Sequence, residues 1–224
     1  RGDVWFGGKT KNPWDIQEGS SGSSAGSASA VAAGLVGFAI GTETLGSIVS
    51  PSTRCGVIGL RPSFGSISTS GFMTLSWSMD KVGPICRTPR DCAIVYSFIK
   101  ENNDVDVSNV AFDHLDQELK IGYTKKLFDK DTSRFYGNNA KTIDLLSQSY
   151  KMDEIDLPNN YPFAVFDIIL RAEAGAFFDS FLRKRLDSSM VEQGERSRAN
   201  SLRQSRLIPA VEYIQANRHR QELI

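Results

Sequence analysis

Serine hydroxyls set among glycines are the residues of this sequence that could do chemistry. Residues 19–27 and 41–48 form two small-residue segments rich in glycine and serine, and Ser23 in the first segment lies 24 residues before Ser47 in the second. Glycine-rich turns leave backbone N–H groups open, and the serines supply hydroxyls. Acyl transfer needs a nucleophile, a proton relay and an oxyanion hole. The two segments together therefore indicate a site for acyl transfer.

A histidine base is not evident for such a serine. A serine nucleophile usually takes histidine as its base, and the sequence has only His114 and His219. His114 lies in an acidic stretch and His219 lies among arginines, so both are interpreted as surface residues. Ile48 follows Ser47, where a nucleophile elbow would have a second glycine. The sequence therefore disfavours a Ser-His-Asp triad.

Several blocks in order resemble the amidase signature family of serine hydrolases. Residues 23–27 match the family's Ser-Ser-Gly-Gly-Ser motif, and residues 41–48 match its Gly-Thr-Asp-Thr-Gly-Gly-Ser-Ile motif. Residues 55–62 match the block that follows in the family. The resemblance covers about residues 6–95, with a weaker similarity at 209–220. Motifs that keep order and spacing are far more specific than a lone glycine motif.

The resemblance assigns a role to each matching residue. It implies that Ser47 is the nucleophile and that Ser23, preceded by a cis peptide bond, relays the proton. The family's catalytic lysine lies several tens of residues before the cis-serine, and therefore outside this chain. Lys9 and Lys11 are too close to Ser23 to be that residue. The implied oxyanion hole consists of four backbone N–H groups, those of Thr44, Leu45, Gly46 and Ser47.

Three positions depart from the family's pattern. Leu45 replaces the first glycine of a pair, Ala25 replaces another glycine, and Ser66 replaces an arginine. None of these changes removes a hydroxyl or a backbone N–H used in the chemistry. The departures bear on substrate preference rather than on the reaction.

Composition excludes several classes of protein. The 224 residues are 40% hydrophobic and 23% charged, and 26 basic residues balance 26 acidic ones. This is ordinary globular composition, which favours neither nucleic acid nor an anionic membrane as a partner. Cys55, Cys86 and Cys92 have no metal-type spacing and are expected to be buried, reduced thiols in a cytoplasmic protein. No metal or cofactor is expected. The chain begins at Arg1, which leaves a preceding secretory signal open.

Alternating strand and helix patterns predict an α/β fold. We expect a mixed central β-sheet covered by helices on both faces, the amidase signature fold, incomplete at both ends because both ends lack helix caps or a starting Met. Residues 1–224 are expected to form one amidase domain fragment, with the serine site in 1–101 and the following α/β part in 102–224. Expected strands are 36–41, 57–60, 119–123 and 152–157, and expected helices are 27–35, 88–102, 140–150, 163–185 and one from 209.

Three functions fit these expectations. The first is a stand-alone amidase that hydrolyses the carbon–nitrogen bond of a small-molecule amide through a Ser-cisSer-Lys acyl-enzyme mechanism. The second is the glutaminase-type A subunit of an Asp/Glu-tRNA amidotransferase, the only one of the three that would bring tRNA and partner subunits. The third is a catalytically silent scaffold of the same fold. No membrane is expected, a homodimer remains open, and the chain by itself is expected to be inactive because its lysine lies elsewhere.

Overall fold

The computed structural model describes residues 2–101, 120–129, 136–158 and 161–224. These residues belong to two compact units, one formed by Arg1–Asn109 with Phe163–Ile224 and the other by Val110–Pro162. His114 lies outside the described residues. The expected division of a single domain into 1–101 and 102–224 stays a prediction.

A three-stranded antiparallel sheet forms the centre of the first unit. Its strands are β5 (Phe38–Glu43), β7 (Lys81–Cys86) and β6 (Ile58–Gly59), in the order β5-β7-β6. The β5–β7 register runs from Phe38 opposite Cys86 to Glu43 opposite Lys81. The end of β5 therefore meets the start of β7, and the segment with Ser47 leaves the sheet at this point.

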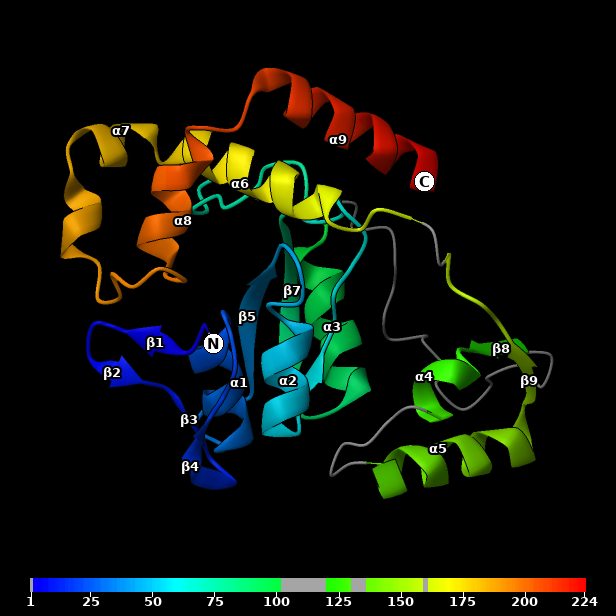
Figure 1. Cartoon of the computed structure of the whole chain (residues 1–224). Helices are drawn as coiled ribbons and strands as arrows, with labels where there is room; N and C mark the ends of the chain where they lie inside the picture. The colour runs from blue at the N-terminus through cyan, green and yellow to red at the C-terminus, as the bar shows by residue number, and fades with distance from the viewer. Residues whose placement is uncertain (1, 102–119, 130–135, 159–160) are drawn as a thin grey trace. The chain divides into compact units, whose positions relative to one another are not determined.

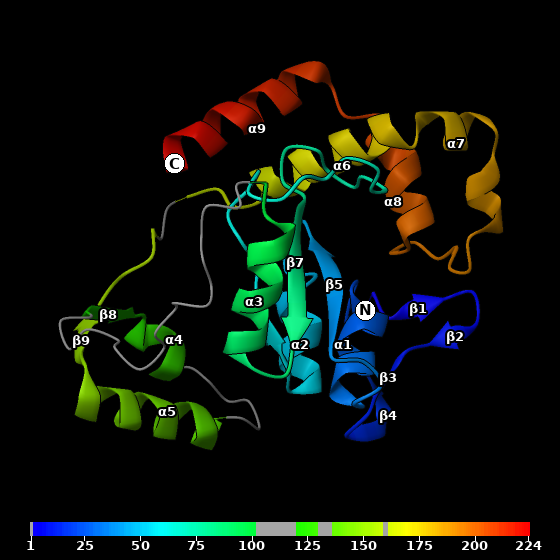
Figure 2. The same ribbon diagram turned by 180° about the vertical axis from the view of Figure 1, so that it is seen from behind.

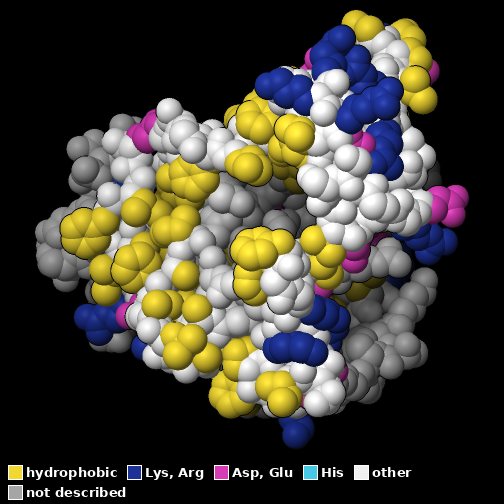
Figure 3. Space-filling model, turned by 90° about the vertical axis from the view of Figure 1, so that its left-hand side faces the viewer, with side chains coloured by type: hydrophobic (Ala, Val, Ile, Leu, Met, Phe, Trp, Pro, Cys, Tyr) yellow, Lys and Arg dark blue, Asp and Glu magenta, His cyan; other side chains and the backbone are white. Residues whose placement is uncertain are grey.

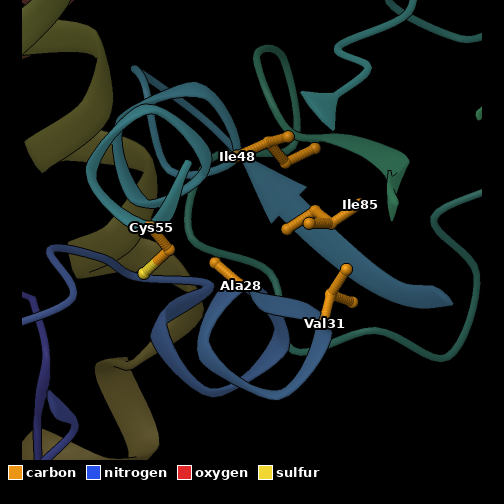
Figure 4. Packing of buried hydrophobic residues seen from close by; sticks show 5 residues of the cluster. All are labelled: Ala28, Val31, Ile48, Cys55 and Ile85. Atoms are coloured by element: carbon orange, nitrogen blue, oxygen red, sulfur yellow. The ribbon is translucent and has the colours of Figure 1, made fainter. Parts of the chain in front are cut away.

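Helices cover both faces of this sheet. Helices α1 (Ala25–Ala32) and α2 (Val49–Cys55) lie on one face, in front of the sheet in Figure 1, and α3 (Pro89–Ile99) lies on the other, in front in Figure 2. The core between α1, α2 and the sheet is fully buried and includes Ala28, Val31, Ile48, Cys55 and Ile85 (Figure 4). Small residues on α1 allow this close approach, as the sequence indicated.

Two hairpins precede α1. Strands β1 (Val4–Trp5) and β2 (Gly8–Lys9) form one, and β3 (Lys11–Asn12) and β4 (Asp15–Gly19) form the other. The second hairpin is fastened to the end of α2, because the Asn12 side chain donates to the Arg54 carbonyl at 3.0 Å and Trp14 Nε1 donates to the Cys55 carbonyl at 2.8 Å. Sequence patterns had predicted neither hairpin.

Among the described residues of the first unit, the part from Phe163 onward contains four helices and a short 3₁₀ turn. They are α6 (Val165–Phe177), α7 (Asp179–Arg183), the 3₁₀ turn (Leu186–Ser189), α8 (Arg198–Ser205) and α9 (Ala210–Leu223). The single helix expected over 163–185 is wrong, because the chain leaves helical geometry at Phe178. Helix α6 packs against α8 and α9. A Cβ at Gly175 of α6 would lie 2.2 Å from Ser205 Oγ of α8, so glycine permits this contact.

The second unit is a small α/β element. Strands β8 (Lys120–Tyr123) and β9 (Lys151–Glu154) pair in parallel, and α4 (Lys125–Asp129) and α5 (Tyr136–Ser149) connect them. Parallel pairing requires such a crossover connection. The expected strands at 119–123 and 152–157 and the expected helix at 140–150 are confirmed, with shifted ends.

The chain thus has the α/β architecture predicted from the sequence. Cys55, Cys86 and Cys92 are free and buried, as expected. No described helix combines the length and apolar character that crossing a membrane demands. Apolar side chains are exposed on the side that carries α7, α8, β1 and β2 (Figure 3). The exposed large hydrophobic residues of the chain include Trp5, Phe6 and Val191.

Candidate active site

Ser23 and Ser47 lie in the wall of one small pocket. The pocket has a volume of about 130 Å³ and opens where β5 ends and β7 begins. Ser23 comes from the turn before α1, and Ser47 comes from the turn before α2. Its other lining residues are Thr42, Thr44, Thr69, Phe72, Met73, Thr74, Leu75, Asp80, Lys81 and Val82. Two residues predicted from motifs 24 positions apart are therefore brought together in space.

Hydrogen bonds of the first serine segment hold the two turns together. The Ser24 N–H donates to the Ser47 carbonyl at 3.1 Å, and the hydroxyls of Ser21 and Ser50 lie 2.7 Å apart. The Ser24 hydroxyl also bonds to both the N–H and the carbonyl of Thr42, each at 3.1 Å. The Gly22–Ser23 peptide bond is cis, where the resemblance had predicted a cis bond. The role of Ser23 as a proton relay stays a prediction.

A buried carboxylate fixes the turn that carries Ser47. Glu43 Oε2 accepts hydrogen bonds from the N–H groups of Ile48 at 2.8 Å and Val49 at 3.0 Å. The carboxylate thereby satisfies donors at the start of α2, which are otherwise unpaired in a helix. Arg61 Nε lies 3.8 Å from Glu43 Oε1 and offsets the buried charge. Sequence reasoning did not assign this role, because helix α2, which begins six residues after Glu43, was not expected.

The four predicted oxyanion donors lie on one short loop between β5 and α2. Thr44 lines the pocket, while the Leu45 side chain is 55% exposed. Gly46 adopts a positive φ of 94°, which favours glycine at this position. Within the described part of the chain, no residue accepts a hydrogen bond from the N–H groups of Leu45, Gly46 or Ser47. The loop is chemically suited to an oxyanion, and that function stays a prediction.

Asp80 and Lys81 are pocket residues that sequence reasoning missed. Asp80 accepts from the Thr44 hydroxyl at 2.5 Å, and Lys81 Nζ donates to the Thr44 carbonyl at 3.2 Å. Burial lowers the pKa of Lys81, and nearby Arg61 lowers it further, whereas the carboxylates of Glu43 and Asp80 act in the opposite direction. In the sequence, Asp80 and Lys81 were marked only as two adjacent charged residues directly before the apolar residues of β7.

The pocket wall formed by residues 69–75 is anchored from a distant helix. Glu173 of α6 is buried, and its Oε2 accepts from the Ser76 hydroxyl at 2.5 Å and from the Ser78 N–H at 3.1 Å. Its Oε1 accepts from the Tyr213 hydroxyl of α9 at 2.9 Å. No local pattern in the sequence links these residues.

The histidine and lysines set aside in the sequence are not part of the pocket. His219 pairs with Glu222 at 3.1 Å on α9, as expected for a surface histidine. Lys9 pairs with Asp3 at 3.7 Å, and Lys11 lies in β3. None of the three lines the pocket of Ser23 and Ser47.

Comparison with known proteins finds a matching family and similar sequences. The family model described as Amidase matches residues 3–222. The A subunit of the glutamyl-tRNA(Gln) amidotransferase of Thermotoga maritima is 32% identical over 200 residues, which are 84% of this chain and 42% of that protein. The corresponding protein of Roseiflexus castenholzii is 37% identical over 180 residues, covering 75% of this chain and 37% of that protein.

Solved structures give the same result. The native peptide amidase of Stenotrophomonas maltophilia has a TM-score of 0.74 and 28% identity, over 95% of this chain and 50% of that one. A crystal structure described as that of an amidase has a TM-score of 0.84 at 24% identity, which supports the fold alone, over 99% of this chain and 49% of that one. The chain spans about half the length of these relatives or less. The match of the family model over nearly the whole sequence establishes that this chain belongs to the amidase signature family.

Proposed function

We propose that the full-length protein is an amidase that cleaves the carbon–nitrogen bond of a small amide through an acyl-enzyme on Ser47. The observation that carries this proposal is the shared pocket of Ser23 and Ser47, beside a loop whose N–H groups have no described acceptor. Membership of the amidase family supports it. That the substrate of the whole protein is a small-molecule amide is part of the same proposal.

The proposed reaction follows from the groups around the pocket. A neutral lysine outside this chain takes a proton through Ser23 as the Ser47 oxygen attacks the amide carbonyl. N–H groups of residues 44–47 stabilise the oxyanion, an interaction worth about 3 kcal/mol for a well-placed donor. Ser23 then returns a proton to the leaving amine, and water hydrolyses the Ser47 ester to release the acid.

Hydrolysis of simple aryl and aliphatic amides by the full-length protein tests this assignment. Ser47→Ala is expected to abolish turnover, because it removes the atom that forms the acyl-enzyme. Ser63→Ala is the matched control, since it removes an exposed serine hydroxyl that does not line the pocket. Ser23→Ala is expected to lower kcat by about two to four orders of magnitude, as loss of acid–base catalysis does. Equal rates for wild type and Ser47→Ala would refute the proposal.

A component of a tRNA-dependent amidotransferase is the second candidate. It is favoured by the curated relatives from Thermotoga maritima and Roseiflexus castenholzii, both named as the A subunit of a glutamyl-tRNA(Gln) amidotransferase. The two candidates differ in what they need for turnover. A stand-alone amidase hydrolyses amides when purified alone. An amidotransferase component releases ammonia from glutamine only with its partner subunits and tRNA.

The 224-residue chain expressed by itself is proposed to be inactive and poorly soluble. No lysine of the chain matches the family's catalytic position, so Ser47 lacks its proton acceptor. Exposed apolar side chains, such as Phe6, Leu207 and Ile224, favour aggregation. Expression of residues 1–224 beside the full-length protein, with the same amide assay, checks both statements. A soluble chain as active as the full-length protein would place the base within these residues.

A further inference from the structure

Asp80 and Lys81 stand side by side at the start of β7, in the wall of the pocket that contains Ser23 and Ser47. The proposed reaction gives neither residue a role. Both are half-buried, and both contact Thr44, the first residue of the loop that leads to Ser47.

The Asp80 carboxylate joins two walls of the pocket. Its Oδ1 accepts from the Thr44 hydroxyl at 2.5 Å. Its Oδ2 accepts from the N–H groups of Leu75 at 2.8 Å and Ser76 at 2.9 Å. Hydrogen bonds to an ionised carboxylate are stronger than those between neutral groups. Asp80 therefore ties the loop before α2 to the wall formed by residues 69–75.

Lys81 holds the other side of Thr44. Its ammonium donates to the Thr44 carbonyl at 3.2 Å and also to the Met79 carbonyl. The charged groups that face it are Arg61, Glu43 and Asp80. Glu43 and Asp80 are already engaged with backbone N–H groups, so the carbonyl oxygens are the direct partners of the lysine.

Peptide geometry transmits this contact to the next residue. The Thr44 carbonyl and the Leu45 N–H belong to the same peptide unit, which is planar and, when trans, directs these two groups oppositely. A cation that holds the carbonyl therefore also fixes the direction of the N–H. The Leu45 N–H is one of the donors assigned to the oxyanion hole.

We propose that Asp80 and Lys81 are positioning residues that clamp Thr44 and thereby orient the Leu45 N–H toward the oxyanion. This inference rests on the proposed function of Ser47. Lys81 acts through the Thr44 carbonyl, and Asp80 acts through the Thr44 hydroxyl. The clamp orients a hydrogen bond to the oxyanion, which exists only in the transition state, and it therefore leaves ground-state binding of the amide unchanged.

Steady-state kinetics of Lys81→Met in the full-length protein test the clamp. We expect kcat to fall by about ten- to a hundred-fold, somewhat less than outright loss of an oxyanion donor, with KM within two-fold of wild type. Lys81→Arg keeps a cationic donor and is expected to recover part of the loss. Arg87→Met is the matched control, because Arg87 donates to the Val36 carbonyl at 3.0 Å just beyond the other end of β7, away from the pocket. Its kcat is expected to equal that of wild type.

A trifluoromethyl ketone matched to the assayed amide provides a readout that general destabilisation does not move. The Ser47 oxygen adds to the ketone carbon, the carbonyl oxygen becomes an oxyanion, and the base takes the serine proton. The affinity of the enzyme for the ketone is expected to change in parallel with kcat/KM across Lys81→Met, Thr44→Val and Thr44→Ser. Thr44→Ser, which keeps the hydroxyl, is expected to remain near wild type.

Two results would overturn the clamp. One is unchanged kcat in both Lys81→Met and Thr44→Val, and the other is a raised KM with unchanged kcat, which would assign Lys81 to substrate binding. Ser47→Ala separates the two proposals. If Ser47→Ala abolishes turnover while both Lys81→Met and Thr44→Val match wild type, only the clamp fails. If Ser47→Ala retains turnover, the proposed function itself fails.

Discussion

Glu43 and Glu173 are both buried carboxylates, 4% and 1% exposed, but they connect the chain over very different distances. Glu43 accepts hydrogen bonds from the N–H groups of residues five and six positions later in the sequence. Glu173 bonds to Ser76 and Ser78, almost a hundred positions earlier, and to Tyr213, forty positions later. The first carboxylate shapes a turn, and the second joins segments that no local pattern relates.

This difference predicts different consequences when each carboxylate is removed. Glu43 holds the turn of Ser47 directly, so its loss should affect turnover as well as stability. Glu173 of α6 binds Ser76 and Ser78, which follow the pocket wall formed by residues 69–75. It does not line the pocket of Ser23 and Ser47. Its loss should act mainly on the free energy of unfolding.

The largest expected effect on stability is that of Glu173→Ala. Three donors lose their acceptor, and each buried group left unpaired costs about 1–3 kcal/mol, so we expect unfolding free energy to fall by about 3–5 kcal/mol. Denaturant titration of the full-length protein measures this loss. Glu173→Gln keeps an acceptor oxygen and should lose roughly half as much. A loss below about 1 kcal/mol for Glu173→Ala would show that water replaces the carboxylate.

Compared with Glu173→Ala, Glu43→Ala is expected to lower the free energy of unfolding less but to lower kcat more. Two N–H groups at the start of α2 lose a charged acceptor, which should cost about 2–3 kcal/mol. Because the turn with Ser47 is then less fixed, kcat should fall further than in Glu173→Ala measured on folded protein. The comparison requires both variants in one amide assay under conditions where each is folded. Equal kcat values would contradict a direct role of Glu43 at the site.

Tyr213→Phe removes one donor to Glu173 and should cost about 1 kcal/mol. Burial, and then the hydrogen bond to Glu173, raises the pKa of Tyr213 from its ordinary value of 10.0. A raised pKa in the folded state contributes stability that is complete below the unfolded pKa and is lost as pH rises through the folded pKa. The advantage of wild type over Tyr213→Phe should therefore be constant up to about pH 10 and shrink above it. Parallel denaturation curves at pH 8 and above pH 10 would detect this change, and an advantage that grows with pH would contradict it.

Arg61→Met is expected to have the smallest effect. Arg61 Nε lies 3.8 Å from Glu43, and its side chain is 54% exposed. Exposed ion pairs contribute about 0–1 kcal/mol, so the change in unfolding free energy should stay below about 1 kcal/mol. The same denaturant titration measures it, with higher salt reducing it further. A loss as large as that of Glu43→Ala would mean that Glu43 depends on this cation more than on its two N–H donors.

Local signals predicted local structure. Thr88, Pro89 and Asp91 predicted the start of α3, and the Thr88 hydroxyl accepts from the Asp91 N–H at 3.1 Å. The sequence did not reveal β7, because its Gly83 and Pro84 argue against a central strand. Pro84 nevertheless pairs opposite Ile40, and its carbonyl accepts from the Leu60 N–H at 3.0 Å.

The candidate site likewise contains residues that the sequence predicted and residues that it did not. Motif spacing was enough to place Ser23 and Ser47, which line one pocket. Helix α2 was not expected, since its residues are poor helix formers and its start depends on Glu43. Contacts between Thr44 and Asp80, or between Ser76 and Glu173, join positions 36 and 97 residues apart. Such contacts depend on tertiary packing and leave no periodic signal in the sequence.

Labelling with a serine-directed fluorophosphonate tests the central claim most directly. The reagent phosphonylates an activated serine oxygen with loss of fluoride, and peptide mass spectrometry locates the modified residue. We predict that the full-length protein carries one adduct, on Ser47, and that its amidase activity falls in step with labelling. Ser47→Ala should not be labelled, whereas the control Ser63→Ala should be. An adduct on a different serine, or amide hydrolysis that survives complete labelling, would contradict the assignment of Ser47 as the nucleophile.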